Sequence, residues 1–175
     1  MIGFGTSPLE VMASAAMLKG LAYLDEFTYT ASWIAGTPTA LGANATVDVQ
    51  IFINSDSDFI AQEYNLTAWT AVDTLYVSPD FLISIIRSGS GRELMSAQVP
   101  ASNISGNYRS ASANFPGKNP ISSLYQGNLN TTIRLTNRTG NAMNRVDFSL
   151  RGFKVFYQTN AQGQTGNRQD IFHAL

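Results

Sequence analysis

The sequence predicts an all-β fold, an antiparallel β-sandwich or jelly roll of about eight strands. Apolar and polar residues alternate with a period of two in most segments after residue 25, as in strands with one buried face. Sets of Gly, Pro, Asn, Asp and Ser separate these segments at short intervals. No helical period lies between them, so an α/β fold is excluded.

Residues 1–24 are predicted to form an N-terminal helical arm. Ser7–Glu10 reads Ser-Pro-Leu-Glu, a capping box with proline at the first helical position. The residues that follow are mainly Ala, Leu and Met, with an apolar stripe that includes Leu9, Met17 and Leu24. Two interpretations stay open: the helix packs on its own domain, or it docks on a neighbouring subunit.

Residues 25–157 are predicted to form the sandwich domain. Phe27, Tyr29, Ala31 and Trp33 alternate with polar residues, which places Trp33 on the inward face. The predicted strands are Phe27–Trp33, Val47–Ile53, Phe59–Trp69, Thr74–Val77, Phe81–Arg87, Glu93–Gln98, Thr131–Asn137 and Arg145–Tyr157.

The last predicted strand contains a change of phase at Gly152. Its apolar residues occupy even positions before this glycine, such as Phe148, and odd positions after it, such as Phe153 and Val155. An extra residue at a β-bulge would keep both sets facing inward. We therefore predict a bulge at Gly152 of this strand.

Two segments lack a strand pattern. Residues 99–130 contain three prolines and three glycines and are predicted to form a long loop, whose apolar residues include Tyr108 and Phe115. Residues 158–175 are predicted to form a C-terminal tail, polar at first and then apolar at Ile171, Phe172 and Leu175.

The composition excludes several functions. The 175 residues, enough for one domain, include 11 Lys and Arg against 12 Asp and Glu, for a net charge of −1. That balance argues against direct nucleic-acid binding, which needs a basic excess to neutralise phosphates. No apolar stretch is long enough to cross a membrane, so we expect no membrane partner. The 54 Asn, Ser, Thr and Gln residues supply most of the surface polarity.

Few residue types remain for chemistry. The chain has no cysteine and one histidine, His173, so thiolate sites and multi-histidine metal sites are excluded and we expect no cofactor. Asp56 and Asp58 alternate as in the start of a calcium loop, but Phe59 replaces the required glycine, which favours an Asx-rich turn. With Glu63 they are the candidate carboxylates for a hydrolase, and capping or solvated roles are the simpler interpretation.

The basic residues near the last predicted hairpin could gather into one strip: Arg134, Arg138, Arg145, Arg151 and Lys154. Because acidic residues such as Asp147 lie between them, we expect a face of surface ion pairs.

Three stretches carry a resemblance to a known class of proteins: Asn54–Phe59, Ile85–Arg92 and Asp147–Phe156. Together with the N-terminal helix and the apolar arms, they resemble small β-sandwich structural proteins of tailed bacteriophages. The resemblance implies a capsid cement or decoration protein on the capsid surface of the virion. Its implied partners are the major capsid protein or other virion proteins, and it implies a homo-oligomer, either a trimer or a dimer.

The hypothesis from the sequence is therefore a non-enzymatic protein that bridges neighbouring capsid subunits. Its expected attachment elements are the arm, the long loop and the tail, with these contact residues: Leu9, Met12, Met17, Leu24, Tyr108, Phe115, Ile171, Phe172 and Leu175. One alternative is a head–tail adaptor, a tail protein or a fibre-anchoring component. Alternatives from other classes are a carbohydrate-binding β-sandwich module and a carboxylate-pair hydrolase.

Overall fold

The computed structural model is almost entirely β, which confirms the predicted fold class. It describes residues 15–36, 40–70, 72, 75–77, 80–87, 96–101 and 118–168. A short helical turn spans residues 15–18. The strands are β1 (Ala22–Ile34), β2 (Thr46–Phe52), β3 (Asp58–Thr70), β4 (Leu75–Val77), β5 (Phe81–Arg87), β6 (Val99–Pro100), β7 (Lys118–Tyr125), β8 (Asn130–Asn137) and β9 (Met143–Tyr157).

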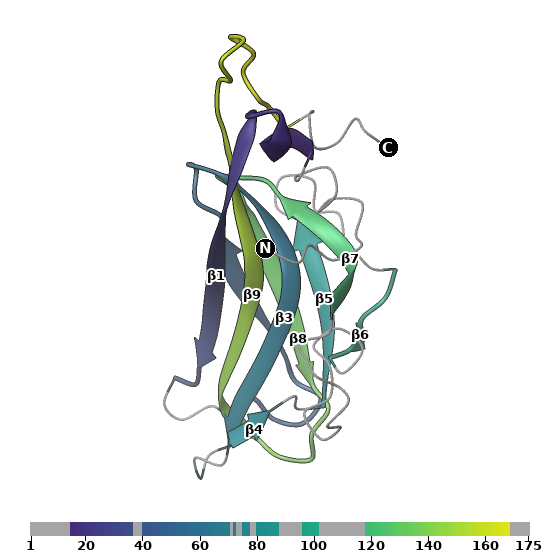
Figure 1. Ribbon diagram of the computed structural model, residues 1–175. Coiled ribbons are helices and arrows are strands. Elements are labelled where there is room, and N and C mark those ends of the chain that lie inside the picture. Colours follow the sequence, from purple (N-terminus) through teal and green to yellow (C-terminus); the bar gives the residue numbers. More distant parts are fainter. Residues whose placement is uncertain are drawn as a thin grey trace.

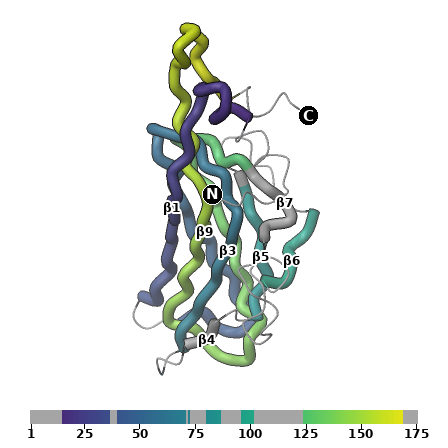
Figure 2. The backbone as a smooth tube through the Cα atoms, in the orientation of Figure 1, coloured from purple at the N-terminus to yellow at the C-terminus, as the bar shows by residue number. Residues whose placement is uncertain are grey.

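The strands form two antiparallel sheets with jelly-roll connections (Figures 1 and 2). The first sheet has the order β1-β9-β3-β4, and β7 pairs with the same edge of β3 as β4 but nearer the start of that strand. The second sheet has the order β2-β8-β5-β6. Apart from β4, the strands pair from the two ends of the chain inward: β1 with β9, β2 with β8, β3 with β7 and β5 with β6. This order of pairing is that of a jelly roll.

The main hydrophobic core lies between the two sheets. Alternate residues of the strands point into it, among them Phe148 of β9 and Ile133 and Leu135 of β8, all without solvent exposure. Trp33 is partly buried and packs against this core, as its position in the alternation predicts. The predicted twofold pattern is thus the pattern of burial in β2, β8, the first half of β9 and β1 from Tyr29 onward, whereas Phe27 of β1 is exposed.

The phase change in β9 marks a change of sheet face. Before Gly152 the apolar residues face the core between the sheets, as Phe148 does. After it, Val155 faces the opposite side of the sheet and joins a second buried cluster. We call this second set the outer cluster; it contains Ala16, Ala22, Ile60, Leu124 and Val155, with Leu24 and Tyr157 packed against it. Both faces of the sheet are covered at this end, so the alternation reverses without an inserted residue in β9.

The prediction of a bulge at Gly152 of β9 is therefore wrong, because the bulge lies in β3. β9 pairs with β1 without interruption through Gly152, whereas the register with β3 shifts between Ala61 and Glu63. The extra residue is Gln62 of β3. A Cβ on Gly152 would lie 1.9 Å from the Ile60 carbonyl oxygen, so glycine is needed there because the bulged strand approaches closely.

Three predicted boundaries also change. β7 lies inside the predicted 99–130 loop, and its Pro120 argued against a strand in the sequence. Among the described residues β7 pairs with β3 alone, and a strand at the edge of a sheet tolerates a residue without an N–H. Of the strand predicted at 93–98, residues 96–98 are not in a strand, and the nearby strand is β6. β1 begins at Ala22, so the predicted boundary after residue 24 falls within this strand.

Candidate functional site

The two ends of the described chain meet at one end of the sandwich. Residues 158–168 form a hairpin beyond the sheet, and residues 15–21 lie against its base (Figures 1 and 2). The Gln158 amide donates to the Leu21 carbonyl at 3.0 Å, and the Asn160 side-chain amide donates to the Lys19 carbonyl at 3.2 Å. We call residues 15–21 and 158–168 together the terminal joint.

The hairpin of the terminal joint is closed by polar contacts. The hydroxyl groups of Thr159 and Thr165 are 2.8 Å apart, and the Asn160 carboxamide oxygen accepts from the amides of Gln162 and Gln164. Gly163 has φ of +75°, a left-handed conformation that suits glycine in a tight turn. These local bonds give the hairpin a defined shape beyond the sheet.

Asp58 fastens the end of this hairpin to the sandwich. Arg168 donates to both carboxylate oxygens of Asp58, each at 2.7 Å, in the two-pronged geometry that suits guanidinium and carboxylate. Tyr157 and the Gly127 amide also donate to this carboxylate, each at 2.8 Å. The carboxylate is thus buried and held by four donors.

These contacts set the ionisation of the pair. Burial by itself raises the pKa of Asp58, but the hydrogen bonds from Arg168, the Gly127 amide and Tyr157 outweigh it and hold that pKa below its ordinary value. The hydrogen bonds that Arg168 itself makes to Asp58 raise the pKa of Arg168. Both groups therefore stay charged at neutral pH.

The helical turn of the terminal joint has one buried and one exposed side. Ala16 is buried in the outer cluster with Ile60, Leu124 and Val155. Leu18, two residues later, is 91% exposed. The described part of the predicted arm therefore packs on its own domain and also presents an apolar side chain to the outside.

A column of aromatic rings and one cation lies on the inward side of the same end. Tyr23 and Phe156 stack with ring centroids 4.6 Å apart, and the Lys154 ammonium lies 4.4 Å from the centre of the Phe27 ring. Lys154 also contacts Asp56 at 3.2 Å. A hydrogen bond from Ser57 and the contact with Lys154 lower the pKa of Asp56. This column is apolar surface organised around a buried ammonium group.

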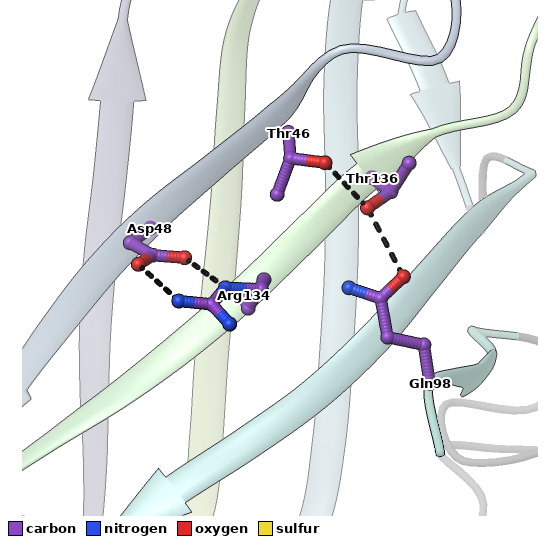
Figure 3. Close-up of polar contacts among 5 residues, drawn as sticks. All are labelled: Thr46, Asp48, Gln98, Arg134 and Thr136. Carbon is purple, nitrogen blue, oxygen red and sulfur yellow. Dashed lines mark hydrogen bonds and ion pairs between the residues drawn. The ribbon is translucent and has the colours of Figure 1, made fainter.

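Polar side chains of β2 and β8 contact one another on the outer face of the second sheet (Figure 3). Arg134 of β8 donates to both oxygens of Asp48 on β2, at 2.9 and 3.1 Å. The Thr136 hydroxyl lies 2.8 Å from that of Thr46 and donates to Gln98 at 3.2 Å. These side chains satisfy one another, as cross-strand pairs on a solvated face do.

The candidate carboxylates each pair with a different cation. Asp56 contacts Lys154, Asp58 contacts Arg168, and Glu63 lies 3.6 Å from Arg151. Arg134 and Arg145 likewise pair with nearby aspartates, so the predicted ion pairs of these two residues are confirmed. The single face predicted for them is wrong, because β8 and β9 belong to different sheets. Residues 54–57 lie in the turn between β2 and β3, and Asp58 is the first residue of β3. Asp56 and Asp58 contact separate partners rather than converging.

Two of the nine predicted contact residues lie in the described structure. Met17 is half-buried in the helical turn, and Leu24 packs against the outer cluster. The other seven lie outside the described residues: Leu9, Met12, Tyr108, Phe115, Ile171, Phe172 and Leu175.

The ion pair that fastens the tail, Arg168 with Asp58, is not predicted by the sequence. Arg168 is the one charged residue between Gln158 and Gln169, and an isolated cation in a polar tail is a weak signal of a carboxylate partner. Nothing local points to Asp58 as that partner, because 110 positions separate the two residues. Gly166 carries a similar hidden constraint, since a Cβ there would lie 1.9 Å from the Leu21 carbonyl oxygen.

In the described residues, no group of three His, Cys, Asp or Glu side chains is placed to hold a metal ion. That part of the chain also contains no helix with the length and apolar character of a membrane span. Comparisons with known protein families and with curated proteins find no match to this chain.

Proposed function

We propose that this chain is a structural protein of a bacteriophage particle, a cement or decoration protein that binds the capsid surface and bridges neighbouring capsid subunits. The observation that supports this proposal best is the terminal joint. Both described chain ends meet there, and its hairpin extends beyond the sheet (Figure 1). A projecting element held by a buried ion pair suits attachment to another protein.

The fold and the chemistry of the described surface agree with a binding role. Jelly rolls occur in viral capsid domains and in lectins, an analogy at the level of fold alone. The ionic side chains of the outer face pair with one another, as Arg134 does with Asp48. Exposed apolar residues such as Leu18 can gain about 25 cal/mol per Å² on burial against a partner. Many copies on one shell then act together through effective concentration.

The attachment role is tested by occupancy of the shell. In one variant, residues 160–164 are replaced by Asn-Gly, which keeps a short turn between Thr159 and Thr165. A second variant lacks residues 1–14. Each is mixed with particles from which the chain has been removed, and bound copies are counted by quantitative mass spectrometry.

We expect both variants to leave most sites empty. The control Gln50→Ala, an exposed position in the middle of β2, should restore full occupancy. Full occupancy by both variants would refute attachment through the chain ends. Hundreds of copies per intact particle would agree with a shell protein, whereas a dozen or fewer would favour the adaptor or tail alternative.

A carbohydrate-binding module is the second candidate, favoured by the exposed aromatic rings of Tyr23 and Phe27 beside Asp56. Trp69 is less suited, because the Arg145 guanidinium lies 4.9 Å from its ring centre. Binding on a glycan array that is lost in Tyr23→Ala and retained in Trp69→Ala would support this candidate. The absence of any glycan signal would count against it.

A further inference from the structure

β1 is a long strand with one free edge. It is 13 residues long and, in the described part of the chain, its backbone pairs with β9 alone. Proteins usually protect such edges with lysine, proline, a bulge or a covering segment, because the unpaired N–H and C=O groups can join another strand. Between Ala22 and Ile34 there is no lysine, arginine, proline or glycine, and the register with β9 has no bulge.

Exposed apolar side chains gather on this side of the sandwich. In the described residues six large hydrophobic side chains are exposed, and three of them lie on β1: Tyr23 at 47%, Phe27 at 37% and Ile34 at 65%. A fourth, Phe52, lies on β2, the end strand of the other sheet. β1 and β2 are in contact, so both free edges lie on one side of the molecule. These side chains are spread along β1, with Tyr23 and Phe27 on one face of the sheet and Ile34 on the other, and a strand added at this edge would reduce their exposure.

We propose that β1 pairs antiparallel with β1 of a second copy of this chain, about a twofold axis at Thr28. In an antiparallel pair, two residues that lie opposite each other point to the same face of the sheet. When both strands are copies of β1, the two residue numbers are therefore both odd or both even, and they add to an even total. The register that overlaps the whole strand places Ala22 opposite Ile34 and Thr28 opposite itself. This pairing extends the sheet across two copies by β-strand addition.

The side chains of β1 are self-complementary in this register. Tyr23 faces Trp33 and Phe27 faces Tyr29, which joins aromatic residues on one face of the sheet. The carboxylates face uncharged residues, because Asp25 lies opposite Ala31 and Glu26 opposite Thr30. Shifting the axis two positions, to Glu26, would bring two like charges together. Among the even-sum registers, the one with its axis at Thr28 pairs all 13 residues of the strand. β1 is therefore compatible with a second copy of itself as the partner, and the inference holds whether or not the protein binds a capsid.

Disulfide trapping tests both the partner and the register. The chain has no cysteine, so a single introduced thiol is unique. In the proposed register, the two copies of residue 28 have Cα atoms about 4.5 to 5.5 Å apart, within reach of a disulfide. The two copies of residue 30 are offset by four positions, about 13 Å along the strands. Thr28→Cys should form a disulfide-linked dimer on oxidation, and Thr30→Cys, exposed on the same face, should give no disulfide-linked dimer.

Charge changes at the axis give a second test in the full chain. Thr28→Glu places two carboxylates face to face and should weaken dimerisation by about tenfold or more, measured by sedimentation equilibrium. Mixing Thr28→Glu with Thr28→Lys should restore dimers, while Thr28→Ser should dimerise like the parent. Circular dichroism checks that each variant is folded.

Two results would overturn the inference. One is an unmodified chain that sediments as a monomer at its highest soluble concentration, which would leave the free edge to another protein. The other is a dimer that forms a disulfide through Thr30→Cys but not through Thr28→Cys, since that pairing would have a different register.

Discussion

At the scale of single residues, glycine positions carry constraints that no side-chain contact reveals. Gly152 lies opposite the bulge at Gln62, where the two backbones approach more closely than a Cβ permits. The phase change of β9 predicted a bulge in this strand, and that prediction is wrong. The phase changes because the buried face of the sheet changes, and the alternation of one strand does not distinguish this from an inserted residue.

We expect Gly152→Ala to destabilise the fold by about 3 kcal/mol, because its Cβ would require the bulge to move. The free energy of unfolding, measured with urea, gives the value directly. Gly140→Ala is the matched control: no atom lies within 4 Å of its added Cβ, and the change should stay within about 0.5 kcal/mol. Equal effects in the two variants would mean that β3 and β9 are not so close at Gly152.

At the scale of elements, the terminal joint converts a polar tail into an ordered hairpin. Local bonds of Asn160 shape the hairpin, but its position depends on Arg168 and on the close contact at Gly166. β7 depends on its context in a similar way. Its sequence contains Asn, Pro and Ser and has little alternation, and pairing with β3 imposes the strand.

Arg168→Ala should lower stability by about 2 kcal/mol at neutral pH, because it leaves the buried Asp58 carboxylate without its cation. The ion pair holds the pKa of Asp58 below its ordinary value of 3.8, so the contribution of the pair to the free energy of unfolding is complete above pH 3.8. The contribution is lost as the pH falls through the lowered pKa. Urea unfolding of parent and variant should therefore differ at pH 7 and converge in strong acid.

Asp58→Asn combined with Arg168→Ala serves as the control for that prediction. With no buried carboxylate left at this position, the double variant should lack the dependence on pH that comes from Asp58. A difference between parent and Arg168→Ala that remained constant into strong acid would show that the ion pair does not anchor the tail.

At the scale of the whole molecule, one core joins both sheets. Its members come from β1, β2, β3, β5, β7, β8 and β9, so neither sheet can bury its apolar face without the other. The free edge of β1 takes no part in the packing of the two sheets against each other. The jelly roll thus accounts both for the stability of one copy and for the side on which a second copy would add.

Ile133→Ala should destabilise the protein by about 3 kcal/mol, since its fully buried side chain fills the space between the sheets. For a domain of this size the melting temperature should fall by about 9 °C. Calorimetry should show one transition in parent and variant. The neighbour Thr132→Ala, which faces away from the core, should change stability by no more than about 0.5 kcal/mol. Separate melting of the two sheets would contradict the shared core.

The sequence by itself determined the fold class and most strand positions, because a strand with one buried face needs a local alternation. It also located the Asx-rich turn between β2 and β3. The tertiary structure decided what depends on distant partners: the strand order, the bulge on β3, the ion pair of Asp58 with Arg168, and the free edge of β1. Such features arise where segments far apart in the chain meet, and no local pattern encodes that meeting.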